Sequence, residues 1–168
     1  KSLANKKILI KRIESIQNLG AIDILCTDKT GTLTENNIVL QKYIDVNGKD
    51  NLNTLEDAYL NSYFGTGMKN LVDRAILAYA KENKMENIIN DYKKIDEIPF
   101  DYSRRKMSVV VENDGHYRMI TKGALEEMLK ICNKVKLNDK VIDFSNELML
   151  NATKESENLA KTGMQVIA

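Results

Sequence analysis

DKTGTLT, residues 28–34, follows the mostly apolar run IDILCT at positions 22–27. The run is short and is bounded by Gly20 and Gly31, a pattern that predicts a strand buried inside a sheet. Asp28 therefore lies where a strand gives way to a loop of small hydroxyl and glycine residues. In open α/β sheets, ligands bind at this end of the strands. A carboxylate held there is well placed to attack a phosphoryl group.

The rest of the chain alternates between helix and strand patterns. Capping residues and apolar spacing predict helices over residues 13–19, 54–64, 70–83, 124–131 and 145–162. Strand patterns cover residues 38–46, 92–98, 106–112, 116–121 and 164–168. The turn signals Asn47-Gly48 and Asn113-Asp114-Gly115 indicate hairpins. The patterns in residues 38–142 therefore predict an antiparallel sheet with helices packed on it. The first 35 residues, by contrast, are typical of the start of an α/β domain.

Composition excludes several classes of function. Lys and Arg total 25 against 24 Asp and Glu, so the net charge of +1 gives no sign of nucleic-acid binding. Cys26 and Cys132 are far apart and have no CxxC pattern, so we expect two buried thiols rather than a metal site or a disulfide. No apolar run approaches the roughly 18 residues of a membrane span, and residues 1–11 do not form a signal peptide.

Three segments together resemble the P-type ion-pumping ATPases. DKTGTLT matches their phosphorylation motif, and residues 99–109, PFDYSRRKMSV, are similar to the adenine-pocket segment of their nucleotide-binding domain. Lys122-Gly123-Ala124 matches their KGA motif, with Leu125 where many relatives have proline. Residues 11–20, 67–73, 98–102 and 122–127 look specifically like the bacterial magnesium-transporting branch.

The resemblance assigns the reaction centre to the DKTGTLT segment. It implies that Asp28 becomes an aspartyl phosphate and that Lys29 neutralises charge beside it. Asp28 and the backbone carbonyl of Thr30 are expected to bind the catalytic Mg²⁺. Phosphoryl transfer depends mainly on positioning and charge neutralisation, which suits these roles.

The resemblance also assigns an ATP site. Phe100 takes the role of the aromatic that stacks on adenine, because a π-face binds a base. Arg105 takes the cationic role at the phosphates, which a guanidinium binds in bidentate fashion. Lys122 and Gly123 supply charge and close backbone approach beside a helix. Asp73 aligns with an acidic residue near the adenine amino group.

The implied fold is α/β (α+β), with an antiparallel sheet and flanking helices. An incomplete segment similar to the haloacid dehalogenases precedes it. We assign residues 1–37 to the start of the phosphorylation domain, residues 38–163 to the nucleotide-binding domain, and residues 164–168 to the return to the phosphorylation domain. Residues 164–168 are also expected to pair with residues 22–27.

The implied function is ATP-driven ion transport, most specifically of Mg²⁺, with ATP and Mg²⁺ as cofactors. The chain would be a cytoplasmic piece of an integral protein of a bacterial plasma (inner) membrane. Its partners would be the remaining phosphorylation, actuator and transmembrane domains. The isolated chain is expected not to turn over ATP. Residues 1–35 are expected to be held by contacts that differ from those of the parent, or by a second copy of the chain.

Three alternatives remain open at this stage. A calcium or proton pump would share every motif above, because the ion sites lie in membrane helices outside this chain. A soluble haloacid-dehalogenase-type phosphatase shares the strand and Asp28, but usually carries a second aspartate where this chain has Thr30. A module that only binds nucleotide is the non-enzyme alternative.

Overall fold

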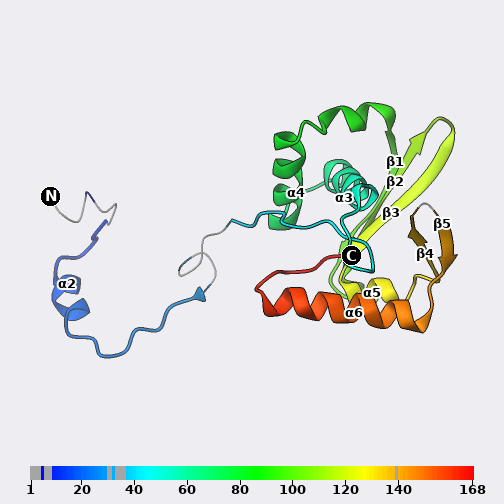
Figure 1. The fold of residues 1–168 in the computed structure, drawn as a ribbon. Coiled ribbons are helices and arrows are strands. Elements are labelled where there is room, and N and C mark those ends of the chain that lie inside the picture. Colours follow the sequence, from blue (N-terminus) through cyan, green and yellow to red (C-terminus); the bar gives the residue numbers. More distant parts are fainter. Residues whose placement is uncertain (1–4, 6–8, 30–31, 33–36, 139) are drawn as a thin grey trace. The chain divides into compact units, whose positions relative to one another are not determined.

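The computed structural model describes residues 5, 9–29, 32, 37–138 and 140–168. The chain divides into two compact units, residues 1–36 and residues 37–168, whose elements Figure 1 labels. Among the described residues, no helix is both long and apolar enough to cross a membrane.

The first unit contains one short helix, α2 (Glu14–Leu19), close to the predicted position. The predicted buried strand at residues 22–27 is wrong: these residues form no strand, and Ile24 and Leu25 are 82% and 71% exposed. A parallel strand needs neighbours on both sides to bond its backbone and cover its side chains. The described part of this unit contains no such neighbour. Cys26 is consequently exposed, so the expected burial of both thiols is also wrong.

The second unit is built on a three-stranded antiparallel sheet of order β1-β2-β3. Strand β2 (Lys106–Asn113) pairs with β3 (His116–Gly123) without a break in register, around the predicted turn at Asp114 and Gly115. Strand β1 (Lys93–Asp101) continues past Pro99, where the sequence predicted its end. The register with β2 shifts between Ile98 and Asp101, and such an irregularity accommodates a residue that lacks an N–H.

Helix α3 (Leu52–Phe64) packs on β2 and β3, and α4 (Leu71–Glu82) packs on α3. In Figure 1, α3 lies between α4 and the strands. The core between α3 and the sheet consists of Leu60, Val109, Val111 and Ile120. A second cluster joins α3 to α4 through Tyr59, Ile76 and Ala80.

The start of α3 differs from the prediction, whereas the start of α6 agrees with it. Asn51 caps α3, since its Oδ1 accepts hydrogen bonds from the N–H groups of Asn53 (2.9 Å) and Thr54 (3.2 Å). Helix α3 therefore begins two residues before Thr54, where the sequence predicted its start. Ser145 caps α6 (Asn146–Lys161), as predicted.

The remaining elements are short. They are the 3-10 helix η2 (Glu86–Asp91), α5 (Leu125–Leu129), and a second sheet formed by β4 (Lys134–Leu137) and β5 (Lys140–Asp143). The predicted strand at residues 38–46 is reduced to a single bridge between Ile44 and Asp50, although Gly48 does make the expected turn. Residues 164–168 form no strand. Ala168 instead exchanges two backbone hydrogen bonds with Gly123, at 2.7 and 3.0 Å.

Candidate nucleotide-binding site

One end of the three-stranded sheet gathers most of the predicted ATP-site residues. The register places Asp101, Lys106 and Gly123 in one row across the three strands. The neighbours of this row along the chain are three predicted site residues, Phe100, Arg105 and Lys122. Residues far apart in sequence therefore meet at one edge of the unit.

A buried ion pair lies beside this row. Lys122 Nζ pairs with the carboxylate of Asp73, from the first turn of α4, and donates a second hydrogen bond to Ser62 Oγ at 2.8 Å. Lys122 is 9% exposed, Asp73 6% and Ser62 1%. The structure thus joins Lys122 and Asp73, which are predicted site residues, to Ser62, which no sequence pattern indicated.

The electrostatics of the pair follow from its burial. Removal from water lowers the pKa of Lys122, and the adjacent Asp73 carboxylate opposes that change. An ammonium group has three N–H donors, and Asp73 and Ser62 accept two of them. The pair can therefore offer a polar ligand a third donor on Lys122, with little net charge behind it.

The loop after α3 holds this pair in place. Lys69 Nζ donates to the carbonyls of Ser62 (2.7 Å), Tyr63 (3.1 Å) and Gly65 at the end of α3. Asn70 then caps α4 through a reciprocal capping box with Asp73. Lys69 was missed by sequence reasoning, although a lysine just beyond a helix C-terminus is a known signal for bonds to its last carbonyls.

A carboxylate on β1 anchors the same loop. Glu97 accepts hydrogen bonds from Lys94 Nζ at 2.6 Å, from the Thr66 N–H at 2.8 Å and from the Thr66 hydroxyl. The bonds from Lys94 and Thr66 lower the pKa of Glu97 to about 2, from an ordinary value of 4.5. The loop that leads to Asp73 is thus tied to the sheet by an ionised glutamate.

This anchor predicts an acid-dependent loss of stability. Because the pKa of Glu97 is lower in the folded state, its contribution is present above pH 4.5 and is lost as the pH falls toward 2. The free energy of unfolding, measured with urea between pH 2 and 7, should therefore fall more steeply in this window for the wild type than for Glu97→Gln. Equal slopes for the two proteins would contradict the assignment.

The predicted aromatic residue lies near the end of β1, and the predicted cationic residue lies on the turn between β1 and β2. Phe100 is 51% exposed, and its ring meets that of Tyr102 edge to face, with 5.2 Å between centroids. Arg105 has a positive φ of 52°, and its N–H donates to the carbonyl of Asp101 at 2.7 Å. A half-exposed ring is available for stacking on a base, which a ring enclosed in the core would not be.

Gly123 joins this turn to the KGA segment. A side chain at Gly123 would bring Cβ within 2.7 Å of the Arg105 carbonyl oxygen and 2.6 Å of Lys106 Cβ. The next residue, Ala124, donates its N–H to the same carbonyl at 3.1 Å. Glycine is required here because the two backbones lie in contact.

The predicted reaction residues belong to the other unit. Asp28 and Lys29 are exposed, and the Thr27 hydroxyl donates to the Asp28 carbonyl oxygen at 3.3 Å. Thr30, the other predicted Mg²⁺ ligand, lies outside the described residues. The described residues contain no group of three or more His, Cys, Asp or Glu side chains that could hold a metal ion.

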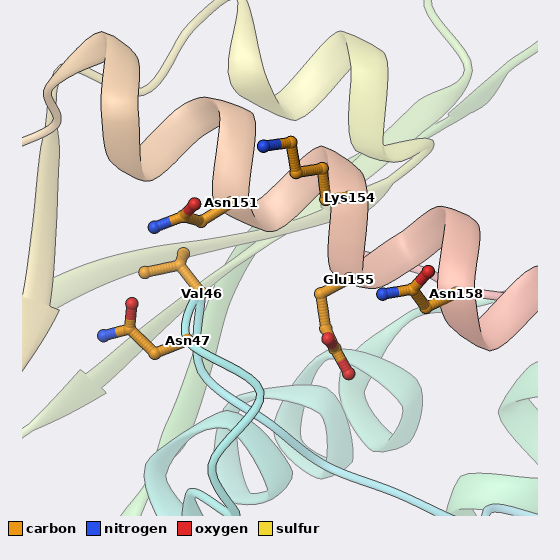
Figure 2. Close-up of a pocket in the computed structure, with 6 residues that line it drawn as sticks. All are labelled: Val46, Asn47, Asn151, Lys154, Glu155 and Asn158. Atoms are coloured by element: carbon orange, nitrogen blue, oxygen red, sulfur yellow. The ribbon is translucent and has the colours of Figure 1, made fainter.

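A polar pocket of about 230 Å³ lies elsewhere on the second unit. Figure 2 shows it between the turn at Asn47 and the side chains of α6. Its lining residues are Val46, Asn47, Asn151, Lys154, Glu155 and Asn158. None of these is a predicted site residue, and the pocket has no aromatic wall for a base.

Comparison with known proteins identifies the family to which this chain belongs. Residues 65–168 match the family model described as P-type ATPase, cytoplasmic domain N. This chain therefore belongs to the P-type ATPases, and the matched residues all lie in its second unit.

Individual relatives narrow the comparison. The chain is 42% identical over 167 residues to "Magnesium-transporting ATPase, P-type 1" of Escherichia coli, covering 99% of this chain and 19% of the relative. It is 41% identical to the protein of the same name in Salmonella typhimurium, covering 99% and 18%. "Calcium-transporting ATPase 1" of Bacillus cereus is 29% identical over 161 residues, covering 83% and 18%. The chain thus spans about a fifth of the length of these relatives.

Proposed function

We propose that this chain is the ATP-binding part of a magnesium-transporting P-type ATPase, in which Asp28 accepts a phosphoryl group from ATP. The observation that carries the proposal is the single row across β1, β2 and β3 that brings together Phe100, Arg105 and Lys122. The chain is 41–42% identical to magnesium-transporting ATPases over 99% of its length, and this similarity supports the choice of ion. The match to the N domain argues against a soluble phosphatase.

Each site residue has a proposed task in binding. The face of Phe100 stacks on adenine, and Lys122 donates its third N–H to the base while Asp73 holds the ammonium in place. Arg105 binds phosphate oxygens, and Gly123 keeps the arginine turn against the KGA segment. The proposed base site is thus mainly aromatic and nearly neutral, whereas the phosphate site carries positive charge.

The proposed chemistry takes place at Asp28. A carboxylate oxygen of Asp28 forms a bond to the γ-phosphorus, the bond from that phosphorus to the bridging oxygen breaks, and ADP leaves with the electron pair. Mg²⁺ suits oxygen ligands and often uses one or two carboxylates plus substrate phosphates, so the exposed Asp28 fits it, with the Thr30 carbonyl as the second proposed ligand. When bound, the ion would neutralise phosphate charge. Lys29 would contribute a positive charge next to the nucleophile.

The same proposal covers domains and partners. Residues 1–37 would open the phosphorylation domain and residues 38–163 would form the nucleotide-binding domain. Residues 164–168 were predicted to return to the phosphorylation domain, but the bonds between Ala168 and Gly123 favour a place beside β3. The remaining phosphorylation, actuator and transmembrane domains would be the partners, with this chain on the cytoplasmic side of a bacterial inner membrane.

The test is ATP binding to this chain, followed by NMR titration. An open aromatic site with few charged contacts should give a dissociation constant of roughly 0.1 to several millimolar, which corresponds to a binding free energy of about 3–5.5 kcal/mol. Phe100→Ala should weaken binding by about 1–3 kcal/mol, because it removes base stacking.

Tyr117→Ala is the matched control. It removes a 71% exposed aromatic at the opposite end of the same sheet, where Tyr117 pairs with Glu112. This variant should bind ATP like the wild type. If ATP shifts no resonance near Phe100, Lys122 and Asp73, the proposed site is wrong.

A further inference from the structure

Arg105, the proposed phosphate-binding residue, is paired with a carboxylate of its own chain. Its Nη2 lies 3.6 Å from Oε2 of Glu126, and the two side chains are 56% and 69% exposed. Glu126 belongs to α5, which begins directly after the KGA segment. A carboxylate given no role in binding thus lies next to the guanidinium that the nucleotide would need.

The backbone places these two side chains opposite each other. The Arg105 N–H is bonded to the Asp101 carbonyl, and the Arg105 carbonyl accepts from the Ala124 N–H, two residues before Glu126. The close approach at Gly123 brings the two segments together. The position of Glu126 relative to Arg105 is therefore set by main-chain contacts, while both side chains remain accessible from solvent.

Carboxylate and phosphate oxygens compete for the same guanidinium donors. A negatively charged nucleotide phosphate that binds Arg105 must displace the Glu126 carboxylate from it. Adenine and ribose carry no such charge, so their binding at Phe100 and Lys122 is not opposed in this way. Glu126 therefore weakens the binding of the polyphosphate but not the binding of adenosine.

Building on the proposed function, we propose that Glu126 is a specificity-determining residue that competes with the polyphosphate for Arg105 and lowers the affinity for ATP relative to adenosine. The competition grows with the number of phosphates, from AMP to ADP to ATP. When the nucleotide leaves, the ion pair with Arg105 re-forms, so Glu126 favours release.

The experiment compares ATP with adenosine on Glu126→Gln at low ionic strength, by NMR titration of the whole chain. ATP should bind to the variant roughly two- to fivefold more tightly than to the wild type. This is the range expected for the loss of one exposed charge pair. The affinity for adenosine should change by less than about 1.5-fold, because adenosine carries no charge to be screened or repelled.

Glu127→Gln is the matched control. It removes the same charge from the adjacent position of α5, where the carboxylate pairs with Lys130 at 2.8 Å. Its effect on ATP affinity should be clearly smaller than that of Glu126→Gln. An equal effect would show that the net charge of α5 matters, and would overturn a specific role for Glu126.

Arg105→Ala separates competition from simple repulsion. This change should weaken ATP binding, and Glu126→Gln added to it should give little further gain, because there is no guanidinium left to compete for. A full gain in the Arg105→Ala background would overturn the proposal, as would an unchanged or weaker ATP affinity in Glu126→Gln alone. ATP binding that does not depend on Phe100 would instead overturn the proposed function, and this inference with it.

Discussion

Asp28→Asn should abolish the phosphoenzyme of an intact pump that carries this chain, while its affinity for ATP stays within about twofold of the wild type. The amide of asparagine has nearly the shape of the carboxylate but does not form the covalent acyl phosphate. The two effects separate because Asp28 belongs to the first unit of the chain, whereas Phe100, Arg105 and Lys122 belong to the second.

Acid-stable incorporation of phosphate from labelled ATP is the direct measurement. Asp23→Asn provides the matched control, since Asp23 is an exposed aspartate of the same unit, five positions before Asp28. It should form phosphoenzyme at the wild-type level. Turnover of ATP by the Asp28→Asn pump at a rate near that of the wild type would rule out the aspartyl-phosphate mechanism for this protein.

The parts of the fold that the sequence predicted well are those determined by local contacts. The β2–β3 hairpin depends on a short turn at Asp114 and Gly115, and its apolar residues Val109 and Val111 face α3. Helix α4 starts at the predicted place because its cap and its apolar stripe lie within one segment. Such signals act over a few residues and need no knowledge of the rest of the chain.

The errors concern strands whose existence depends on distant partners. Residues 22–27 and 38–46 have strand-like composition, but a strand is stabilised only when another strand takes up its backbone hydrogen bonds. The described structure gives residues 22–27 no such partner, and gives residues 38–46 a single bridge. Pro99 led to the opposite error: the strand was predicted to end before it, but an irregular register allows β1 to continue to Asp101.

The contacts within the candidate site could not be predicted from the sequence. Resemblance alone selected Asp73 and Lys122, and nothing local indicates that these residues, 49 positions apart, form a buried pair. Ser62 and Glu126 were missed because a serine inside a helix and a glutamate on a helix surface carry no distinctive signal. The position of Glu126 relative to Arg105 depends on the close backbone approach that the glycine at position 123 allows.

The buried pair supports the second large prediction. Asp73→Ala should lower the free energy of unfolding by about 3–5 kcal/mol, because it leaves the Lys122 ammonium buried without a counter-charge. Urea unfolding of the whole chain measures this loss. Glu82→Ala, an exposed carboxylate at the end of the same helix, should change the value by no more than about 0.5 kcal/mol.

The pH dependence identifies Lys122 as the source of that loss. Burial lowers the pKa of Lys122 below 10.5, so between its folded and unfolded pKa values the unfolded chain binds more protons than the folded chain. Stability should therefore rise with pH in that window, and more strongly in Asp73→Ala, where the opposing carboxylate is gone. Combining Asp73→Leu with Lys122→Met should remove the extra pH dependence and restore most of the lost stability, because no charge remains buried. If the double change is as unstable as Asp73→Ala alone, the loss comes from the α4 cap and packing, and the buried ion pair does not have the energetic role assigned to it.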